Sequence, residues 1–143
     1  MNTIVILADS FRADHIGCYS KFLNPSSLGL GPTLPVKTPN IDKLSKESTL
    51  FYHAYPEGVP TLPMRTAAFT GRYTFPFRFW QPFEKDDILL SEVLGSGGKR
   101  TCLVTDTYHM RNSGFNRGFK KTYFIRGQEH DLFAPIYKAT FID

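Results

Sequence analysis

The sequence predicts an α/β sandwich with a mostly parallel sheet. Short apolar runs that are typical of strands alternate with longer segments that carry helix start and stop signals. Parallel strands need crossover connections, and these are right-handed in almost all known folds. The runs interpreted as strands lie near Thr3–Ala8, Thr49–Tyr55, Arg100–Thr105 and Lys121–Ile125.

The first expected strand, Thr3–Ala8, is short, rich in β-branched residues and almost continuously apolar, as expected of a buried parallel strand. It is followed directly by Asp9 and Ser10. Ligands of open α/β sheets bind beyond the carboxyl ends of the strands, so Asp9 is a candidate functional residue. The alternative is that Asp9 only caps the turn that follows.

Two of the expected helices have clear sequence signals. Thr38 can act as an N-cap, and Pro39 fits the first helical position because it needs no N–H partner there. Ile41 and Leu44 then lie about one turn apart on the apolar face of this helix. A second, amphipathic helix is expected over Ile88–Leu94, where three glycines follow as C-terminal signals.

The segment from Val59 to Tyr73 places a hydroxyl residue where a turn passes into a helix. Pro63 fits the first helical turn, so Thr61 is expected at or just before the helix N-terminus, where free N–H groups and the helix dipole favour an anion. Arg65 lies one turn further on and can hold an oxyanion with two hydrogen bonds. Thr61 is therefore a candidate nucleophile and Arg65 a candidate catalytic cation. The alternative is that Thr61 is only an N-cap and Arg65 is only a surface cation.

A proline-broken aromatic loop follows over residues 75–87. Two interpretations remain open for it. It either forms a wall of the substrate pocket or packs over the helix that starts near Thr61 as part of the core.

Several motifs resemble those of the sulfatase family in the alkaline phosphatase superfamily. Thr61-x-Pro63-x-Arg65, followed by Thr-Gly-Arg at 70–72, resembles the sulfatase signature, in which Cys or Ser occupies the position of Thr61. The pattern Asp-x-x-Arg-x-Asp-x-x-Gly-x-Tyr over residues 9–19 is similar to the opening of sulfatases and phosphonate monoester hydrolases. The run over residues 38–44 looks like the family's first helix, and the run over 124–131 occurs in a bacterial subgroup.

The resemblance implies a three-layer sandwich like that of alkaline phosphatase, of which residues 1–143 would form the N-terminal part of the catalytic domain. Family members are much longer, and their remaining metal ligands and substrate-binding Lys and His residues lie downstream. We therefore expect a truncated chain, or a fragment that needs a complement.

The resemblance also implies a divalent cation, with Ca²⁺, Mn²⁺, Mg²⁺ and Zn²⁺ as candidates. Asp9 and Thr61 are its candidate ligands. Ser10, which stands where many sulfatases have a second Asp, is a further one. Tyr108-His109 matches a Trp-His pair that touches substrate in the family, although Thr107 occupies the position of a Lys. His109 is thus a candidate substrate-binding residue, with a surface histidine as the alternative.

The implied function is hydrolysis of sulfate, phosphate or phosphonate esters. Typical sulfatases convert their Cys or Ser to formylglycine, and a threonine lies outside that conversion. The chemistry at Thr61 therefore favours phosphate or phosphonate esters. The alternative is a non-catalytic pseudoenzyme, or an inactive fragment, that retains the scaffold.

The charge and hydropathy of the chain limit the classes of binding partner that we expect for the protein. The net charge is +4, but the basic residues are scattered and no nucleic-acid-binding motif is present, so we expect a small anionic ester as substrate. The first apolar run is too short to span a membrane and has no basic n-region, so we expect a cytoplasmic protein. Self-association through an exposed strand edge is a further expectation.

Overall fold

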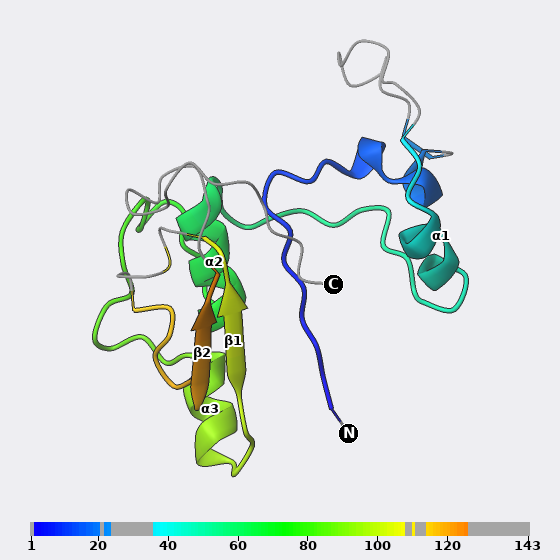
Figure 1. Cartoon of the computed structure of the whole chain (residues 1–143). Coiled ribbons are helices and arrows are strands. Elements are labelled where there is room, and N and C mark those ends of the chain that lie inside the picture. Colours follow the sequence, from blue (N-terminus) through cyan, green and yellow to red (C-terminus); the bar gives the residue numbers. More distant parts are fainter. Residues whose placement is uncertain (1, 21, 24–35, 108–109, 111–113, 126–143) are drawn as a thin grey trace, which may run out of the picture. The chain divides into compact units, whose positions relative to one another are not determined.

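The computed structural model describes residues 2–20, 22–23, 36–107, 110 and 114–125. The chain divides into two compact units, Met1–Tyr55 and Pro56–Asp143, and each is described here by itself (Figure 1). No helix among the described residues is long and apolar enough to cross a membrane.

The first unit is built from short helices. Two 3₁₀ turns, η1 (Ala13–His15) and η2 (Gly17–Tyr19), precede the helix α1 (Pro39–Ser45). Thr38 is the N-cap residue of α1 and Pro39 is its first residue, which confirms the predicted start. The predicted apolar face of α1 is exposed, with Ile41 39% and Leu44 65% accessible to solvent.

Hydrogen bonds tie α1 to η2. Thr38 Oγ1 accepts a hydrogen bond from the Gly17 N–H at 2.8 Å and donates one to Asp42 Oδ1 at 3.0 Å. The same Asp42 oxygen accepts a hydrogen bond from the Cys18 N–H at 2.7 Å. Thr38 and Asp42 therefore hold the N–H groups of a turn rather than those of their own helix.

The strands predicted at residues 3–8 and 49–55 are not present among the described elements. Both predictions are wrong for this structure. Apolar and β-branched side chains give a segment strand propensity, but a strand forms only through backbone hydrogen bonds to a neighbouring strand. The first unit has no described strand that could provide them.

The second unit contains two helices and a small sheet. They are α2 (Thr61–Thr70), α3 (Leu90–Ser96), β1 (Cys102–Thr105) and β2 (Lys121–Phe124). The two strands pair in parallel, with Cys102 opposite Lys121 and Thr105 opposite Phe124. Both strands and their parallel pairing confirm the sequence prediction. A sheet of two strands is too small to establish a three-layer sandwich.

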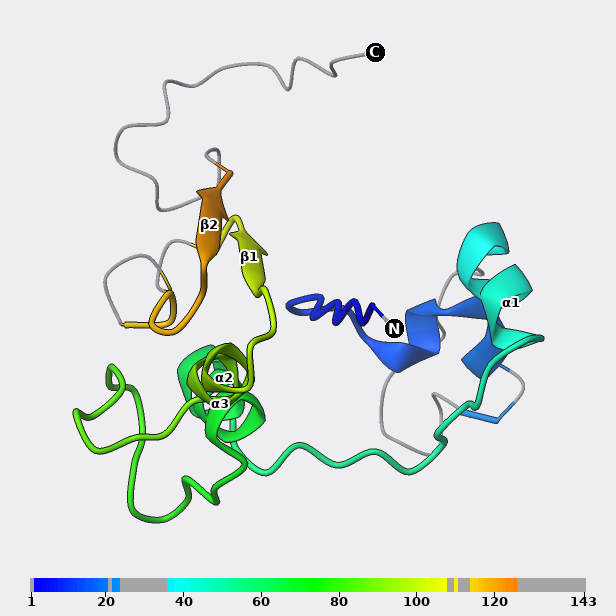
Figure 2. The same ribbon diagram turned by 90° about the horizontal axis from the view of Figure 1, so that it is seen from below.

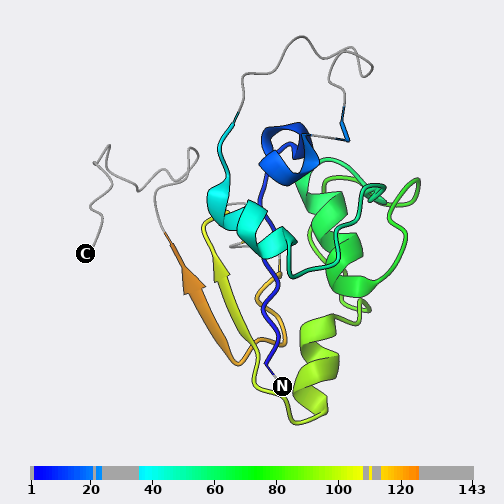
Figure 3. The ribbon, with the colours of Figure 1, turned by 90° about the vertical axis from the view of Figure 1, so that its right-hand side faces the viewer.

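The helices α2 and α3 lie on the same face of this sheet, as a view from below also shows (Figure 2). The helix α2 lies beside the carboxyl ends of β1 and β2, and α3 lies beside their starts (Figure 3). Open α/β sheets place their ligands beyond the carboxyl ends of the strands, so α2 lies on the side of the sheet where a site is expected.

A small core fixes α2 to the sheet. Leu62 of α2 packs with Met110 and Phe115, and Leu103 of β1 packs against this cluster. Burial of a Leu or Phe side chain contributes about 1.5–3 kcal/mol, so these contacts give α2 a defined position over β1.

One of the two predicted roles of the aromatic loop is confirmed, since part of the loop packs into the core, and its role as a wall of the substrate pocket stays a prediction. Phe83 packs into the core, with its ring centroid 4.2 Å from that of Phe115. Phe75 and Phe79 are instead 70% and 62% exposed. One end of the loop is therefore core, and the other end is available to form a pocket wall.

Candidate active site at the start of helix α2

Thr61 is the first residue of α2, which confirms the predicted placement of the helix start. Pro63 lies buried in the first turn, where its missing N–H removes no helical hydrogen bond. The N–H groups of a first turn have no acceptor within the helix. The hydroxyl of Thr61 therefore lies at the N-terminal end of α2, and the N-terminal end of a helix favours a bound anion.

Arg65 is buried, with only 5% of its surface exposed. Its Nε atom has no hydrogen-bond partner among the described residues. A buried N–H of a charged group that lacks an acceptor is costly, so this atom indicates a missing acceptor. The interpretation of Arg65 as a surface cation is wrong because the side chain is buried. Its role as a catalytic cation stays a prediction.

The other end of α2 is closed by the Thr-Gly-Arg motif. Gly71 has a φ of +68° and donates its N–H to the Ala67 carbonyl at 2.8 Å. The Thr70 hydroxyl donates to the Thr66 carbonyl, and Thr70 Oγ1 accepts the Arg72 N–H. The glycine is needed at this position because an αL residue ends the helix.

Glu57 fixes the turn that leads into α2. Its Oε1 accepts hydrogen bonds from the N–H groups of Thr74 (2.7 Å) and Phe75 (3.1 Å), and its Oε2 accepts one from Thr74 Oγ1 (2.8 Å). These donors, the Thr74 N–H first, lower the pKa of Glu57 below its ordinary value. The sequence analysis missed Glu57, because no spacing rule connects residue 57 with residue 74.

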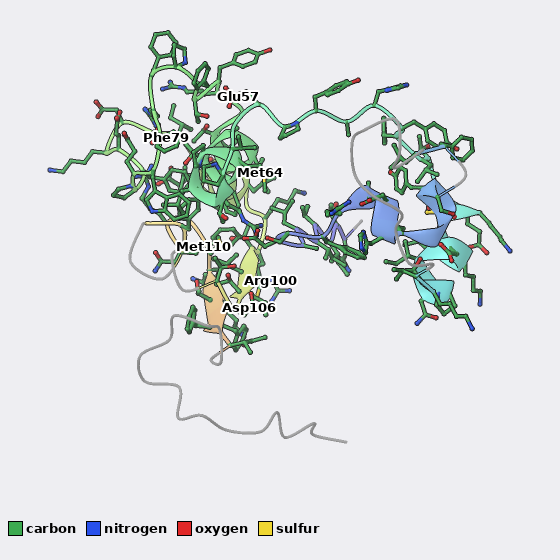
Figure 4. All side chains as sticks on the ribbon, turned by 90° about the horizontal axis from the view of Figure 1, so that it is seen from above. Glu57, Met64, Phe79, Arg100, Asp106 and Met110 are labelled. Carbon is green, nitrogen blue, oxygen red and sulfur yellow. The ribbon has the colours of Figure 1, made fainter. Side chains whose placement is uncertain are left out.

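A pocket of about 190 Å³ opens at this end of the helix. In Figure 4, Met64 lies on α2, and Glu57 and Phe79 lie near this helix. Arg78 forms ion pairs with Asp87 and Glu84, each at 2.7 Å. Its charge is therefore compensated, and the walls of the pocket are mainly apolar. Its lining residues are Pro56, Glu57, Gly58, Val59, Pro63, Phe75, Arg78 and Phe79.

Asp9 and Ser10 lie exposed in the first unit. The Ser10 hydroxyl donates to Asp9 Oδ1 at 3.3 Å. Next to them, Arg12 forms a two-pronged ion pair with Asp14, and this pairing lowers the pKa of Asp14 to about 2. Arg12 is therefore engaged by Asp14.

The described residues do not make up a complete cation site. They contain no group of three or more His, Cys, Asp or Glu side chains that could hold a metal ion. Asp9 and Thr61 belong to different units, and His109 lies outside the described residues. A hard divalent cation needs about six oxygen ligands, more than the candidate ligands Asp9, Ser10 and Thr61 supply.

The comparisons with known proteins agree with the motifs. The model of the family described as Sulfatase matches residues 1–142. No curated protein and no solved structure matches the chain.

Proposed function

Because the chain belongs to the sulfatase family, whose members hydrolyse anionic esters and generally depend on a divalent cation, we propose that it is an ester hydrolase with Thr61 as nucleophile. The observation that carries this proposal is the buried Arg65, one turn from Thr61, whose Nε has no hydrogen-bond partner among the described residues. A nucleophile, a helix N-terminus and a buried guanidinium on one short segment suit a tetrahedral anion.

The preferred substrate is a phosphate or phosphonate ester. Thr61 Oγ1 attacks phosphorus in line with the ester oxygen. The Oγ1–P bond forms as the bond to the alcohol oxygen breaks, and the hydroxyl proton passes to the leaving alcohol. Water then attacks the same phosphorus, which breaks the Oγ1–P bond, releases phosphate or phosphonate and restores the hydroxyl of Thr61.

Arg65 and the first N–H groups of α2 stabilise the charge that develops on the non-bridging oxygens. Preorganised donors of this kind typically contribute a factor of about 10²–10³ each to kcat. We propose Asp9 and the Thr61 hydroxyl as cation ligands, with Ser10 as a further candidate, and His109 as a substrate contact. A bound cation would neutralise the substrate and lower the pKa of a coordinated hydroxyl.

We further propose that residues 1–143 form the N-terminal part of a catalytic domain of the three-layer, alkaline phosphatase type. Family membership and the parallel sheet of β1 and β2 support this architecture. It predicts more parallel strands than the two described.

The test is a comparison of aryl phosphate, phosphonate and sulfate esters with the purified protein, in the presence of Ca²⁺, Mg²⁺, Mn²⁺ or Zn²⁺. Thr61→Ala should abolish turnover while leaving the fold nearly intact, since loss of a hydroxyl at a helix start costs about 1 kcal/mol or less. Wild-type preference for the sulfate ester would refute the phosphate proposal. Full activity of Thr61→Ala would refute the nucleophile.

A second candidate function is non-catalytic binding of an anion. It is favoured by the threonine in place of the family's Cys or Ser, and by the incomplete set of cation ligands among the described residues. Calorimetry with inorganic phosphate separates the two. Binding that Arg65→Ala abolishes, together with no turnover of any ester, would favour the binding protein.

A further inference from the structure

The carboxylate of Glu57 holds together two parts of the chain that lie on either side of α2 in the sequence. Glu57 precedes the helix by four residues, whereas its donors Thr74 and Phe75 follow the helix C-cap, Gly71. The chain therefore leaves the end of α2 and returns to its beginning. The Glu57 carboxylate is the acceptor in all three hydrogen bonds of this contact.

The contact is closely packed around Thr74, which is 1% exposed, whereas Glu57 is half-buried. A Cβ atom on Gly58 would lie 2.6 Å from Thr74 Oγ1 and 3.0 Å from the Cβ of Pro63. Only glycine therefore allows the turn to approach both Thr74 and the first turn of α2. The position of the backbone from Glu57 to Thr61 is set by this contact.

We infer that Glu57 is a positioning residue for the Thr61 nucleophile, an inference that rests on the proposed function. By accepting the N–H groups of Thr74 and Phe75 and the hydroxyl of Thr74, the carboxylate fixes the turn through which the chain enters α2. Near-attack geometry is sensitive, and a displacement of about 1 Å can cost roughly a hundredfold in rate. Loss of the contact should therefore reduce kcat more than substrate affinity.

The substitutions Glu57→Ala and Glu57→Gln separate positioning from a direct role of the charge. Alanine removes every acceptor. The amide oxygen of glutamine can accept both N–H groups, and its NH₂ can donate to Thr74 Oγ1, which then acts as the acceptor. Glu57→Ala should lower kcat for an aryl phosphate at least about tenfold with KM changed less than about threefold, and Glu57→Gln should restore kcat to within about threefold of wild type.

The matched control is Glu92→Ala. Glu92 accepts the Leu89 N–H at the start of α3 and pairs with Arg117, so it is also a structural carboxylate with a lowered pKa. Its loss should lower the melting temperature by an amount similar to Glu57→Ala and leave kcat unchanged.

The outcomes are distinct. An unchanged kcat in Glu57→Ala, when wild type is active and Thr61→Ala is inactive, would overturn the positioning role and leave the proposed function standing. Equal losses in Glu57→Gln and Glu57→Ala would also overturn it, because they would assign the effect to the charge. An inactive wild type, or an active Thr61→Ala, would overturn the proposed function and this inference with it.

Discussion

Among the candidate site residues, Arg65 is the one whose burial and hydrogen bonding say most about its role. It follows Leu62 by three positions, so it lies beside the face of α2 that packs into the core. The residue is 5% exposed, and its Nε has no hydrogen-bond partner among the described residues. The pattern Thr-x-Pro-x-Arg was sufficient to predict the helix start and the spacing. It could not predict the burial of Arg65, because burial depends on tertiary packing rather than on local sequence.

Substitution of Arg65 by lysine should show whether the planar shape of the guanidinium or only its positive charge is needed for activity. Lysine keeps the positive charge but lacks the planar fork that binds an oxyanion through two parallel hydrogen bonds. We expect kcat/KM for an aryl phosphate to fall by about 10²–10³ in Arg65→Lys, and the affinity for inorganic phosphate to fall as well. Arg100→Lys, at an exposed position, is the control. Wild-type kinetics in Arg65→Lys would mean that the fork plays no part.

The lowered pKa of Asp14 predicts how the free energy of unfolding depends on pH. Its pKa falls from 3.8 to about 2, mainly through the hydrogen bond from Arg12. A carboxylate with a lowered pKa stabilises the fold fully above its unfolded pKa, and this stabilisation is lost as the pH falls through the folded pKa. Asp14→Asn should therefore lower the free energy of unfolding at pH 7, and its difference from wild type should shrink between pH 4 and pH 2.

Urea unfolding at a series of pH values measures this difference. Arg12→Gln should reproduce the loss, and the double variant should be no less stable than either single variant, because both changes remove the same ion pair. Additive losses would show that Asp14 is stabilised by something other than Arg12.

At the scale of elements, two helix starts were predicted, and strands only in part. The starts of α1 and α2 depend on local chemistry, a proline in the first turn beside a hydroxyl residue, which the sequence displays directly. The helix expected over Ile88–Leu94 instead begins at Leu90 and ends at Ser96. The strands β1 and β2 and a parallel sheet were predicted, but not that these two strands are neighbours. Residues 3–8 have the same strand propensity but form no strand, because pairing depends on a neighbour rather than on the segment itself. The contact of Glu57 with Thr74 could not be predicted for a related reason, since it depends on the path of the chain after α2.

The end of α2 can be tested through its glycine. Gly71 has a φ of +68° and open space where a Cβ would lie, so Gly71→Ala introduces conformational strain without a steric clash. We expect a loss of about 1 kcal/mol in the free energy of unfolding. Gly95→Ala, inside α3, is the control and should stabilise by about 0.5–1 kcal/mol, because its Cβ meets only an ordinary contact at 3.7 Å. A stable Gly71→Ala would contradict the role of the αL cap.

At the scale of the whole molecule, much apolar surface is exposed. Ile4 and Ile6 are each 85% exposed, and the sheet has two strands, β1 and β2, in the part of the chain that the structure describes. Extended apolar segments and unpaired strand edges favour association between copies. We expect the mean mass from light scattering to rise with protein concentration. Ile4→Lys combined with Ile6→Lys, which changes one face of the segment, should suppress the rise. A concentration-independent monomer mass in wild type would contradict this prediction.

The proposed cation has one candidate ligand in each unit, Asp9 in the first and Thr61 in the second. Asp9 was predicted as a ligand from its place directly after an apolar run. Asp9→Asn should therefore weaken Mn²⁺ binding at least about tenfold and reduce cation-dependent turnover in parallel. The reason is that neutralising one carboxylate removes most of the charge compensation that a hard cation needs.

Titration of free Mn²⁺ by electron paramagnetic resonance measures the affinity without reference to activity. Asp86→Asn, at an exposed position in the second unit, is the matched control and should leave the affinity unchanged. Ser10→Ala should have a smaller effect than Asp9→Asn, because a hydroxyl contributes no charge to the site. An unaltered Mn²⁺ affinity in Asp9→Asn would remove Asp9 from the ligand set and, with it, the only carboxylate among the proposed ligands.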